Sequence, residues 1–111
     1  VRAIYTINPA MPSGKVLTQS MIDDVAQVLK SKNFIVIEDV THRGITLDPS
    51  KEMGTFTKTD VVDSTIVLDG ISKIFGLARS RAGFIIGPRN LIKPIATMLH
   101  MKNCTFNGAS L

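Results

Sequence analysis

The stretch Gly70-Ile71-Ser72-Lys73-Ile74-Phe75-Gly76-Leu77-Ala78-Arg79-Ser80-Arg81-Ala82-Gly83 separates two short apolar runs and decides how they can be joined. The runs cover residues 65–68 and 84–86, and both have the composition of buried strands. Glycines within the stretch indicate turns and close backbone approach. Because the stretch is too short for a comfortable helical crossover, we expect the last strand to run antiparallel to the strand before it.

The preceding residues read as a strand, a helix and a second strand. Residues 2–7 form a strand-like run that ends at Asn8-Pro9, and a Pro- and Gly-rich loop follows as far as Gly14. An amphipathic helix is predicted over about residues 20–32, and the apolar run 34–37 is typical of a buried parallel strand. This pattern predicts a βαβ unit.

Two further segments complete the organisation of the chain. Residues 43–60 are polar and punctuated by Gly and Pro, which predicts a loop with little regular structure. A last helix is predicted from about Leu91 to Met101, with Pro94 in its first turn, where a missing N–H costs little. The fold class is therefore α/β, a mostly parallel sheet flanked by helices.

Charged side chains follow the predicted strands at their carboxyl ends, where ligands bind in open parallel sheets. Glu38 and Asp39 follow the second strand, and Lys73 follows the third. Arg81 comes eight positions after Lys73. A lysine amine that reaches a carbonyl carbon, with a guanidinium nearby to hold a phosphate, indicates covalent capture of an aldehyde cofactor.

The stretch from Gly70 to Gly83 resembles the lysine-site signature of the class I/II aminotransferases, the fold-type I enzymes that use pyridoxal phosphate. In that family the lysine forms a Schiff base with the cofactor and the later arginine binds the cofactor phosphate. Lys73 and Arg81 fall on these two positions. The pattern also allows the residue types found at Gly70, Ser72, Gly76, Arg79 and Gly83. The resemblance implies the family's large-domain fold, with the four strands side by side in chain order.

The resemblance also implies a carboxylate that keeps the pyridine nitrogen protonated, and Asp39 is the candidate. The family has a tyrosine three residues later, where this chain has His42. A register shifted by one residue would instead use Glu38 and Thr41, but a shorter carboxylate is the family's rule. The implied cofactor site comprises Asp39, His42, Gly70, Ser72, Lys73 and Arg81, with Lys73 as the catalytic residue.

Two positions depart from the family pattern. Met11 stands where the family has an asparagine that bonds the cofactor oxygen, and a thioether makes no comparable hydrogen bond. Gly70 stands where many members have a phosphate-binding serine, although its backbone N–H could still serve. Arg79 is interpreted as an exposed or structural residue rather than a second phosphate ligand. Substrate type and catalytic efficiency therefore stay open.

Composition excludes several other functional classes. The formal net charge of +4 comes from scattered basic residues without interleaved aromatic side chains, which argues against a nucleic-acid partner. The apolar runs are too short to cross a membrane. Cys104 is the single cysteine, so an internal disulfide is excluded and a reducing compartment such as the cytoplasm is expected.

We interpret residues 1–111 as part of the large cofactor-binding domain of a longer enzyme, because the family's upstream phosphate loop, ring-stacking residue and small domain are absent. The implied enzyme is a homodimer that transfers an amino group between an amino acid and a 2-oxo acid. A lyase or decarboxylase of the same fold is the nearest alternative, followed by a non-catalytic α/β binding module. A dinucleotide-binding domain is disfavoured because no Rossmann glycine fingerprint follows the first two strands.

Overall fold

The computed structural model describes residues 2–45, 47–48 and 50–102, and it contains a four-stranded sheet. The strands are β1 (Ala3–Ile7), β2 (Ile35–Asp39), β3 (Thr65–Gly70) and β4 (Gly83–Ile86), side by side in that order. The first three are parallel and β4 runs antiparallel to β3, as predicted. Cys104 lies outside the described residues.

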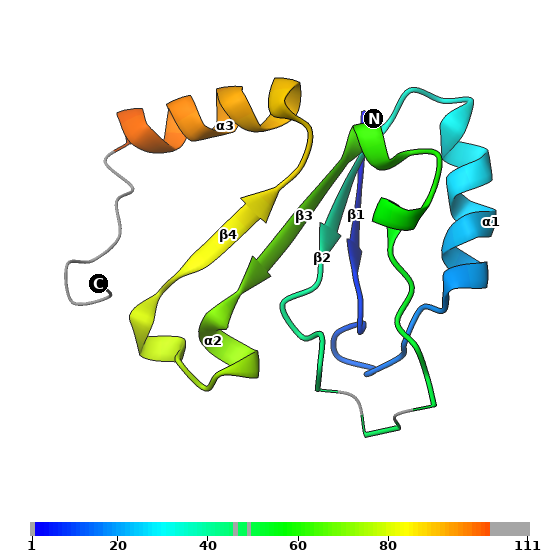
Figure 1. Cartoon of the computed structure of the whole chain (residues 1–111), viewed down its shortest axis with the longest axis horizontal. Helices are drawn as coiled ribbons and strands as arrows, with labels where there is room; N and C mark the ends of the chain where they lie inside the picture. The colour runs from blue at the N-terminus through cyan, green and yellow to red at the C-terminus, as the bar shows by residue number, and fades with distance from the viewer. Residues whose placement is uncertain (1, 46, 49, 103–111) are drawn as a thin grey trace.

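Helices α1 and α3 lie on opposite sides of the sheet, and α2 follows the end of β3 (Figure 1). The α-helices are α1 (Gln19–Lys30), α2 (Ile71–Ile74) and α3 (Arg89–Met101), and three short 3₁₀ turns are η1 (Phe56–Lys58), η2 (Val62–Ser64) and η3 (Ala78–Ser80). Helix α1 covers the β1–β2 side, whereas α3 lies beyond β4 (Figure 1). None of the described helices is both long and apolar enough to span a bilayer.

Helix α1 forms where the periodic apolar pattern predicted a helix. Thr18 caps its first turn by accepting a hydrogen bond from the Met21 N–H at 3.5 Å, so the helix begins slightly earlier than expected. Ile22, Ala26 and Leu29 are its buried residues, spaced so that all three face the sheet. The helix therefore buries one stripe against β2 and leaves its charged face in solvent.

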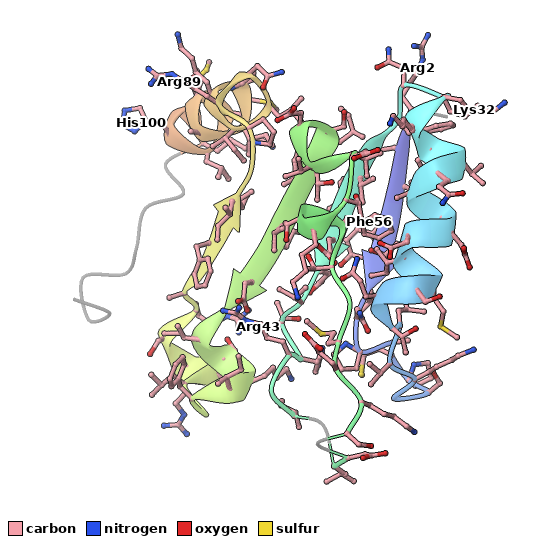
Figure 2. The ribbon with its side chains drawn as sticks, turned by 45° about the vertical axis from the view of Figure 1, so that its right-hand side comes forward. Arg2, Lys32, Arg43, Phe56, Arg89 and His100 are labelled. Atoms are coloured by element: carbon pink, nitrogen blue, oxygen red, sulfur yellow. The ribbon has the colours of Figure 1, made fainter. Side chains whose placement is uncertain are left out.

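The hydrophobic core lies between α1, β2 and the long segment that follows β2. Its buried members are Ile22, Ala26, Leu29, Val36, Phe56 and Val61. Phe56 sits in η1 and is 1% exposed, so the predicted loop is tied to the core at this residue (Figure 2). Gly54 makes this approach possible, because a Cβ there would lie 2.6 Å from the backbone N of Gln19.

The last helix differs from the prediction at its start. Helix α3 begins at Arg89, and the Leu91 and Ile92 N–H groups donate to the Pro88 carbonyl at 2.9 and 3.0 Å. Pro94 is therefore in the second turn and not the first, and the helix tolerates its missing N–H internally. No residue of α3 is buried within the described part of the chain.

Candidate functional site

The carboxyl ends of β1, β2 and β3 meet at one edge of the sheet (Figure 1). Strand β2 ends at Asp39, and β3 ends at Gly70, directly before α2. Helix α2 contains Ser72 and Lys73. The strand topology thus delivers the predicted carboxylate and the predicted lysine to the same edge.

Backbone pairing closes the segment from Gly70 to Gly83, which we call the lysine loop. Gly70 pairs with Gly83 across β3 and β4, and the Ile71 N–H donates to the Ala82 carbonyl at 3.4 Å. A Cβ on Gly83 would lie 3.1 Å from the Asp69 carbonyl oxygen. The glycines at the two ends of the lysine loop therefore permit the close approach of its two stems.

Both predicted cations lie on the lysine loop and are exposed. The Lys73 amine makes no hydrogen bond or ion pair with any residue that the structure describes. Arg81 has a left-handed backbone conformation with φ 50°, and its Nη1 donates to the Ala78 carbonyl at 3.1 Å. A guanidinium carries five N–H donors, so Arg81 keeps most of its donors for an anion. Arg79 is exposed, as expected.

An ion pair that the sequence analysis missed fixes the start of the lysine loop. Asp69 is buried, and one of its oxygens accepts the Gly70 N–H at 2.7 Å. The other oxygen lies 2.6 Å from Arg43 Nη2, so the segment after β2 is tied to the end of β3 (Figure 2). The Gly70 N–H, a predicted phosphate donor, is thus bonded within the chain in this structure.

Three donors surround the Asp39 carboxylate. Its Oδ1 accepts hydrogen bonds from the Thr41 N–H at 3.0 Å and from the Thr41 hydroxyl at 2.8 Å. Its Oδ2 accepts a hydrogen bond from the Tyr5 hydroxyl. Burial by itself would raise the pKa of Asp39, but the bonds from Tyr5 and Thr41 and the nearby His42 outweigh it and lower that pKa. Asp39 is therefore held as an anion.

The alternative register finds little support, because Glu38 points to the other face of the sheet. Glu38 is fully buried against the core. Its carboxylate accepts bonds from the Thr55 hydroxyl at 2.8 Å and the Phe56 N–H at 3.2 Å. Burial raises the pKa of Glu38, and these two bonds oppose the rise. Glu38 therefore ties the long loop to β2 and is not open to a ligand.

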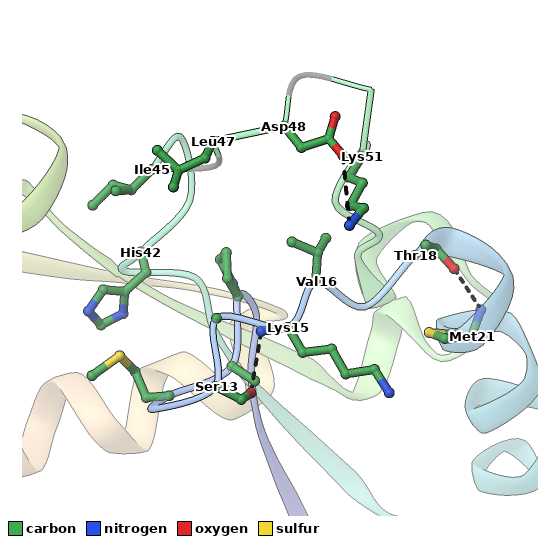
Figure 3. Close-up of a pocket in the computed structure, with 14 residues that line it drawn as sticks. Ser13, Lys15, Val16, Thr18, Met21, His42, Ile45, Leu47, Asp48 and Lys51 are labelled. Atoms are coloured by element: carbon green, nitrogen blue, oxygen red, sulfur yellow. Dashed lines mark hydrogen bonds and ion pairs between the residues drawn. The ribbon is translucent and has the colours of Figure 1, made fainter.

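His42 lies beside a pocket of about 720 Å³ between the segment after β1 and the segment after β2 (Figure 3). Its Nδ1 lies 3.4 Å from the Thr41 hydroxyl oxygen. Since that hydroxyl donates its hydrogen to Asp39, it can only accept from His42, so Nδ1 carries the proton. In the neutral ring Nε2 is then an acceptor. Met11 also lines this pocket and is exposed.

Sequence reasoning missed Tyr5, Arg43 and Asp69, and the reasons differ. Tyr5 can be placed near Asp39 only when the β1–β2 register is known. In that register Ile7 is the partner of Asp39, and Tyr5 lies two residues before Ile7. Arg43 and Asp69 are 26 residues apart and meet through the parallel pairing of β2 and β3. No group of three or more His, Cys, Asp or Glu side chains suited to a metal ion occurs among the described residues.

Solved structures of aminotransferases share this fold. The aromatic aminotransferase from Pyrococcus horikoshii superposes with a TM-score of 0.87 at 24% identity, over 95% of this chain and 28% of that one. The N-succinyldiaminopimelate aminotransferase of Mycobacterium tuberculosis gives a TM-score of 0.85 at 23% identity, over 98% and 28% of the two chains. At these identities the superpositions establish the fold.

Sequence comparisons establish the family. A probable N-acetyl-LL-diaminopimelate aminotransferase from Bacillus subtilis is 31% identical over 78% of this chain and 21% of its own length. A histidinol-phosphate aminotransferase from Akkermansia muciniphila is 32% identical over 96% and 27% of the two chains. This chain thus spans about a quarter of the length of these relatives. The family model for aminotransferase class I and II matches residues 1–105, and the chain belongs to that family.

Proposed function

We propose that residues 1–111 are part of the large cofactor-binding domain of a longer pyridoxal-phosphate-dependent aminotransferase, which moves an amino group between an amino acid and a 2-oxo acid. The observation that carries this proposal is the delivery of Asp39 and Lys73 to one edge of the sheet by adjacent parallel strands. Family membership supports the same assignment. The part held here is expected to be inactive by itself.

The residues at this edge fit pyridoxal phosphate chemically. Asp39 is an anion that suits a protonated ring nitrogen, and Lys73 offers an exposed amine. Arg81 offers exposed guanidinium donors for a phosphate. When bound, the cofactor supplies an aldehyde that amines attack and a ring that withdraws electrons from the substrate.

Each residue then has a definite task. Asp39 would hold a proton on the ring nitrogen, and the Lys73 amine would bind the cofactor covalently and later move a proton. Arg81 holds the phosphate, and the Ser72 hydroxyl adds a donor of the same kind. His42 would contact the cofactor's phenolic oxygen, and a neutral ring with Nδ1 protonated would accept a hydrogen bond there through Nε2. A donor at this position requires the imidazolium.

Covalent labelling tests the cofactor site directly. The full-length protein is mixed with pyridoxal phosphate, its absorbance is recorded before and after borohydride reduction, and the labelled lysine is mapped by mass spectrometry. We expect the label on Lys73 and its loss in Lys73→Ala. Lys58→Ala, at an exposed lysine paired with Glu52, is the control and should label like the wild type. An unchanged spectrum in Lys73→Ala would contradict the proposal.

Product analysis separates the aminotransferase from a lyase or decarboxylase of the same fold, because these chemistries share the lysine and the carboxylate. An amino acid supplied with a 2-oxo acid should yield a new amino acid. Release of ammonia or carbon dioxide would instead favour the alternatives. Full-length protein that takes up no pyridoxal phosphate at all would leave a non-catalytic α/β binding module as the remaining interpretation.

Two further parts of the proposal concern the assembly and its location. We propose a homodimer, since sites of this family usually form between two subunits, and light scattering of the full-length protein measures its mass. A single cysteine in the sequence agrees with a reducing compartment such as the cytoplasm.

A further inference from the structure

We propose that Tyr5 is a positioning residue for Asp39, and that its hydroxyl fixes the orientation of this carboxylate and maintains its negative charge for the cofactor's ring nitrogen. The inference rests on the proposed function, because it assumes the role assigned to Asp39. It adds a residue from β1 to a site otherwise built from the ends of β2 and β3.

The register of the sheet places the two side chains on one face. Ile7 pairs with Asp39 and Tyr5 pairs with Ile37 in the parallel β1–β2 ladder. Residues two apart along a strand share a face, so Tyr5 lies on the same face as Asp39 and one step back from the sheet edge. From this position the Tyr5 hydroxyl donates to Asp39 Oδ2.

The bond from Tyr5 limits where the Asp39 carboxylate can accept further hydrogen bonds. An ionised carboxylate offers about four lone-pair sites. The Thr41 N–H and hydroxyl occupy those on Oδ1, and Tyr5 occupies one on Oδ2. No described residue donates to the remaining site on Oδ2, so Tyr5 determines from which side a further donor can approach Asp39. Without the Tyr5 hydroxyl, the two Thr41 bonds to Oδ1 would be left to hold the carboxylate and Oδ2 would lose its donor.

Only two titratable side chains face Asp39 among the described residues. Tyr5 faces it from β1 and His42 from the segment after β2. From β3 its register partner is the uncharged Leu68, and the neighbouring Asp69 is paired with Arg43. The bond to Asp39, together with burial and the Asp39 charge, raises the pKa of Tyr5 to about 12, so the phenol remains a donor at physiological pH.

Tyr5 has little structural reason to be a tyrosine other than this bond. Its side chain is 55% exposed in this chain and stands outside the buried core. A phenylalanine would preserve the ring and remove the donor alone. The neighbouring Thr6 provides a matched control, because its buried hydroxyl has no hydrogen-bond partner among the described residues.

The test compares Tyr5→Phe, Thr6→Val and the wild type as full-length apoenzymes. The dissociation constant of pyridoxal phosphate is measured over a pH series from acid to neutral, with the unfolding midpoint of each apoenzyme as the folding check. Cofactor binding requires the Asp39 anion, so it weakens as the pH falls through the pKa of that group. Loss of the Tyr5 donor raises this pKa, so the weakening should begin at a higher pH in Tyr5→Phe than in the wild type. Thr6→Val should titrate like the wild type, and the unfolding midpoints should show that all three apoenzymes are folded at the temperature of the binding measurement.

Asp39→Asn separates this inference from the proposed function. If Asp39→Asn weakens cofactor binding while Tyr5→Phe titrates like the wild type, the Tyr5 inference is wrong and the proposed site stands. A loss of affinity in Tyr5→Phe that is equal at every pH would show a packing role and would also overturn the inference. If Asp39→Asn binds the cofactor as the wild type does, both the site assignment and the inference fail.

Discussion

The described parts of residues 2–64 and 65–102 form two halves that are stabilised by different contacts. The first, which we call the core half, contains every member of the buried hydrophobic cluster, from Ile22 to Val61. The second, the lysine half, contains no buried residue in α2, β4 or α3. Its large exposed apolar side chains include Phe75, Leu77, Phe84, Ile86, Met98, Leu99 and Met101. Asp39 is therefore positioned by a packed hydrophobic core, whereas the position of Lys73 is set by the pairing of β3 with β4.

The lysine half leaves more apolar side chains exposed than a packed unit does. Large apolar side chains that are exposed in number often pack against other residues. The outer edge of β4 pairs with no other strand among the described residues, and open edges invite further pairing. In the longer enzyme proposed above, we expect the additional residues to cover the lysine half more than the core half.

The largest expected effect comes from removing the central aromatic residue of the core half. Phe56→Ala should lower the free energy of unfolding by about 3–5 kcal/mol, because Phe56 is 1% exposed and its loss leaves a cavity. Phe75→Ala is the matched control, since Phe75 is 68% exposed in the lysine half. Urea unfolding of the 111-residue chain measures both. Equal losses of unfolding free energy in the two variants would contradict the division into halves. A large loss in Phe75→Ala that occurs only in the full-length enzyme would show that Phe75 packs against residues outside this chain.

The next effect concerns the ion pair that joins the two halves. Arg43→Met should cost about 1–2 kcal/mol, since it leaves the buried Asp69 carboxylate without its charged partner while Arg43 itself is half exposed. Urea unfolding measures this loss. Lys30→Met breaks a pair in which both side chains are exposed, and its unfolding midpoint should match the wild type. A neutral Arg43→Met would show that the halves are joined by strand pairing alone.

The pH dependence of stability tests the buried carboxylate of the core half. The pKa of Glu38 in the folded chain is raised above its ordinary value of 4.5, so folding favours its protonated form. The ionised Glu38 side chain therefore lowers the stability of the folded chain at every pH above its raised pKa. This loss of stability disappears as the pH falls toward 4.5. Glu38→Gln should stabilise the chain relative to the wild type at neutral pH and lose that advantage in acid. Unfolding midpoints at the two pH values measure this, with Glu52→Gln as the control for removing an exposed charge. A Glu38→Gln advantage that grows in acid would contradict the sign.

The smallest effect compares two buried threonine hydroxyls, one in each half: Thr6 in the core half and Thr65 in the lysine half. Thr65→Val removes a buried hydroxyl that donates to the Val61 carbonyl at 2.8 Å, and it should cost about 1 kcal/mol. Thr6→Val removes a buried hydroxyl without a partner and should be neutral or slightly stabilising. Chemical denaturation of both variants resolves the difference. If Thr6→Val were the more costly of the two, the hydrogen-bond assignment at the start of β3 would be wrong.

Sequence patterns predicted the strands and helices well because each pattern reflects a local rule. The antiparallel β4 followed from the short span between Gly70 and Gly83, and α1 followed from its apolar stripe. The predicted start of α3 was wrong because Pro88 and Arg89 carry no periodic apolar signal, so the apolar pattern placed the start at Leu91. Residues 43–60 gave no pattern for η1, since Phe56 is held by contacts with α1 and β2 that are distant in sequence.

The sequence by itself determined the family signature, the α/β order of elements and the identities of Lys73, Arg81 and Asp39 as candidate site residues, because spacing within a short segment is preserved in the linear chain. Only the tertiary structure decided that Asp39 faces outward while Glu38 is buried, since alternation along β2 needs a core to define its inner face. It also decided that Tyr5 reaches Asp39 and that Arg43 reaches Asp69. These contacts follow from the register of parallel strands, which is fixed by the packing of α1 and the long loop against the sheet and not by any one segment.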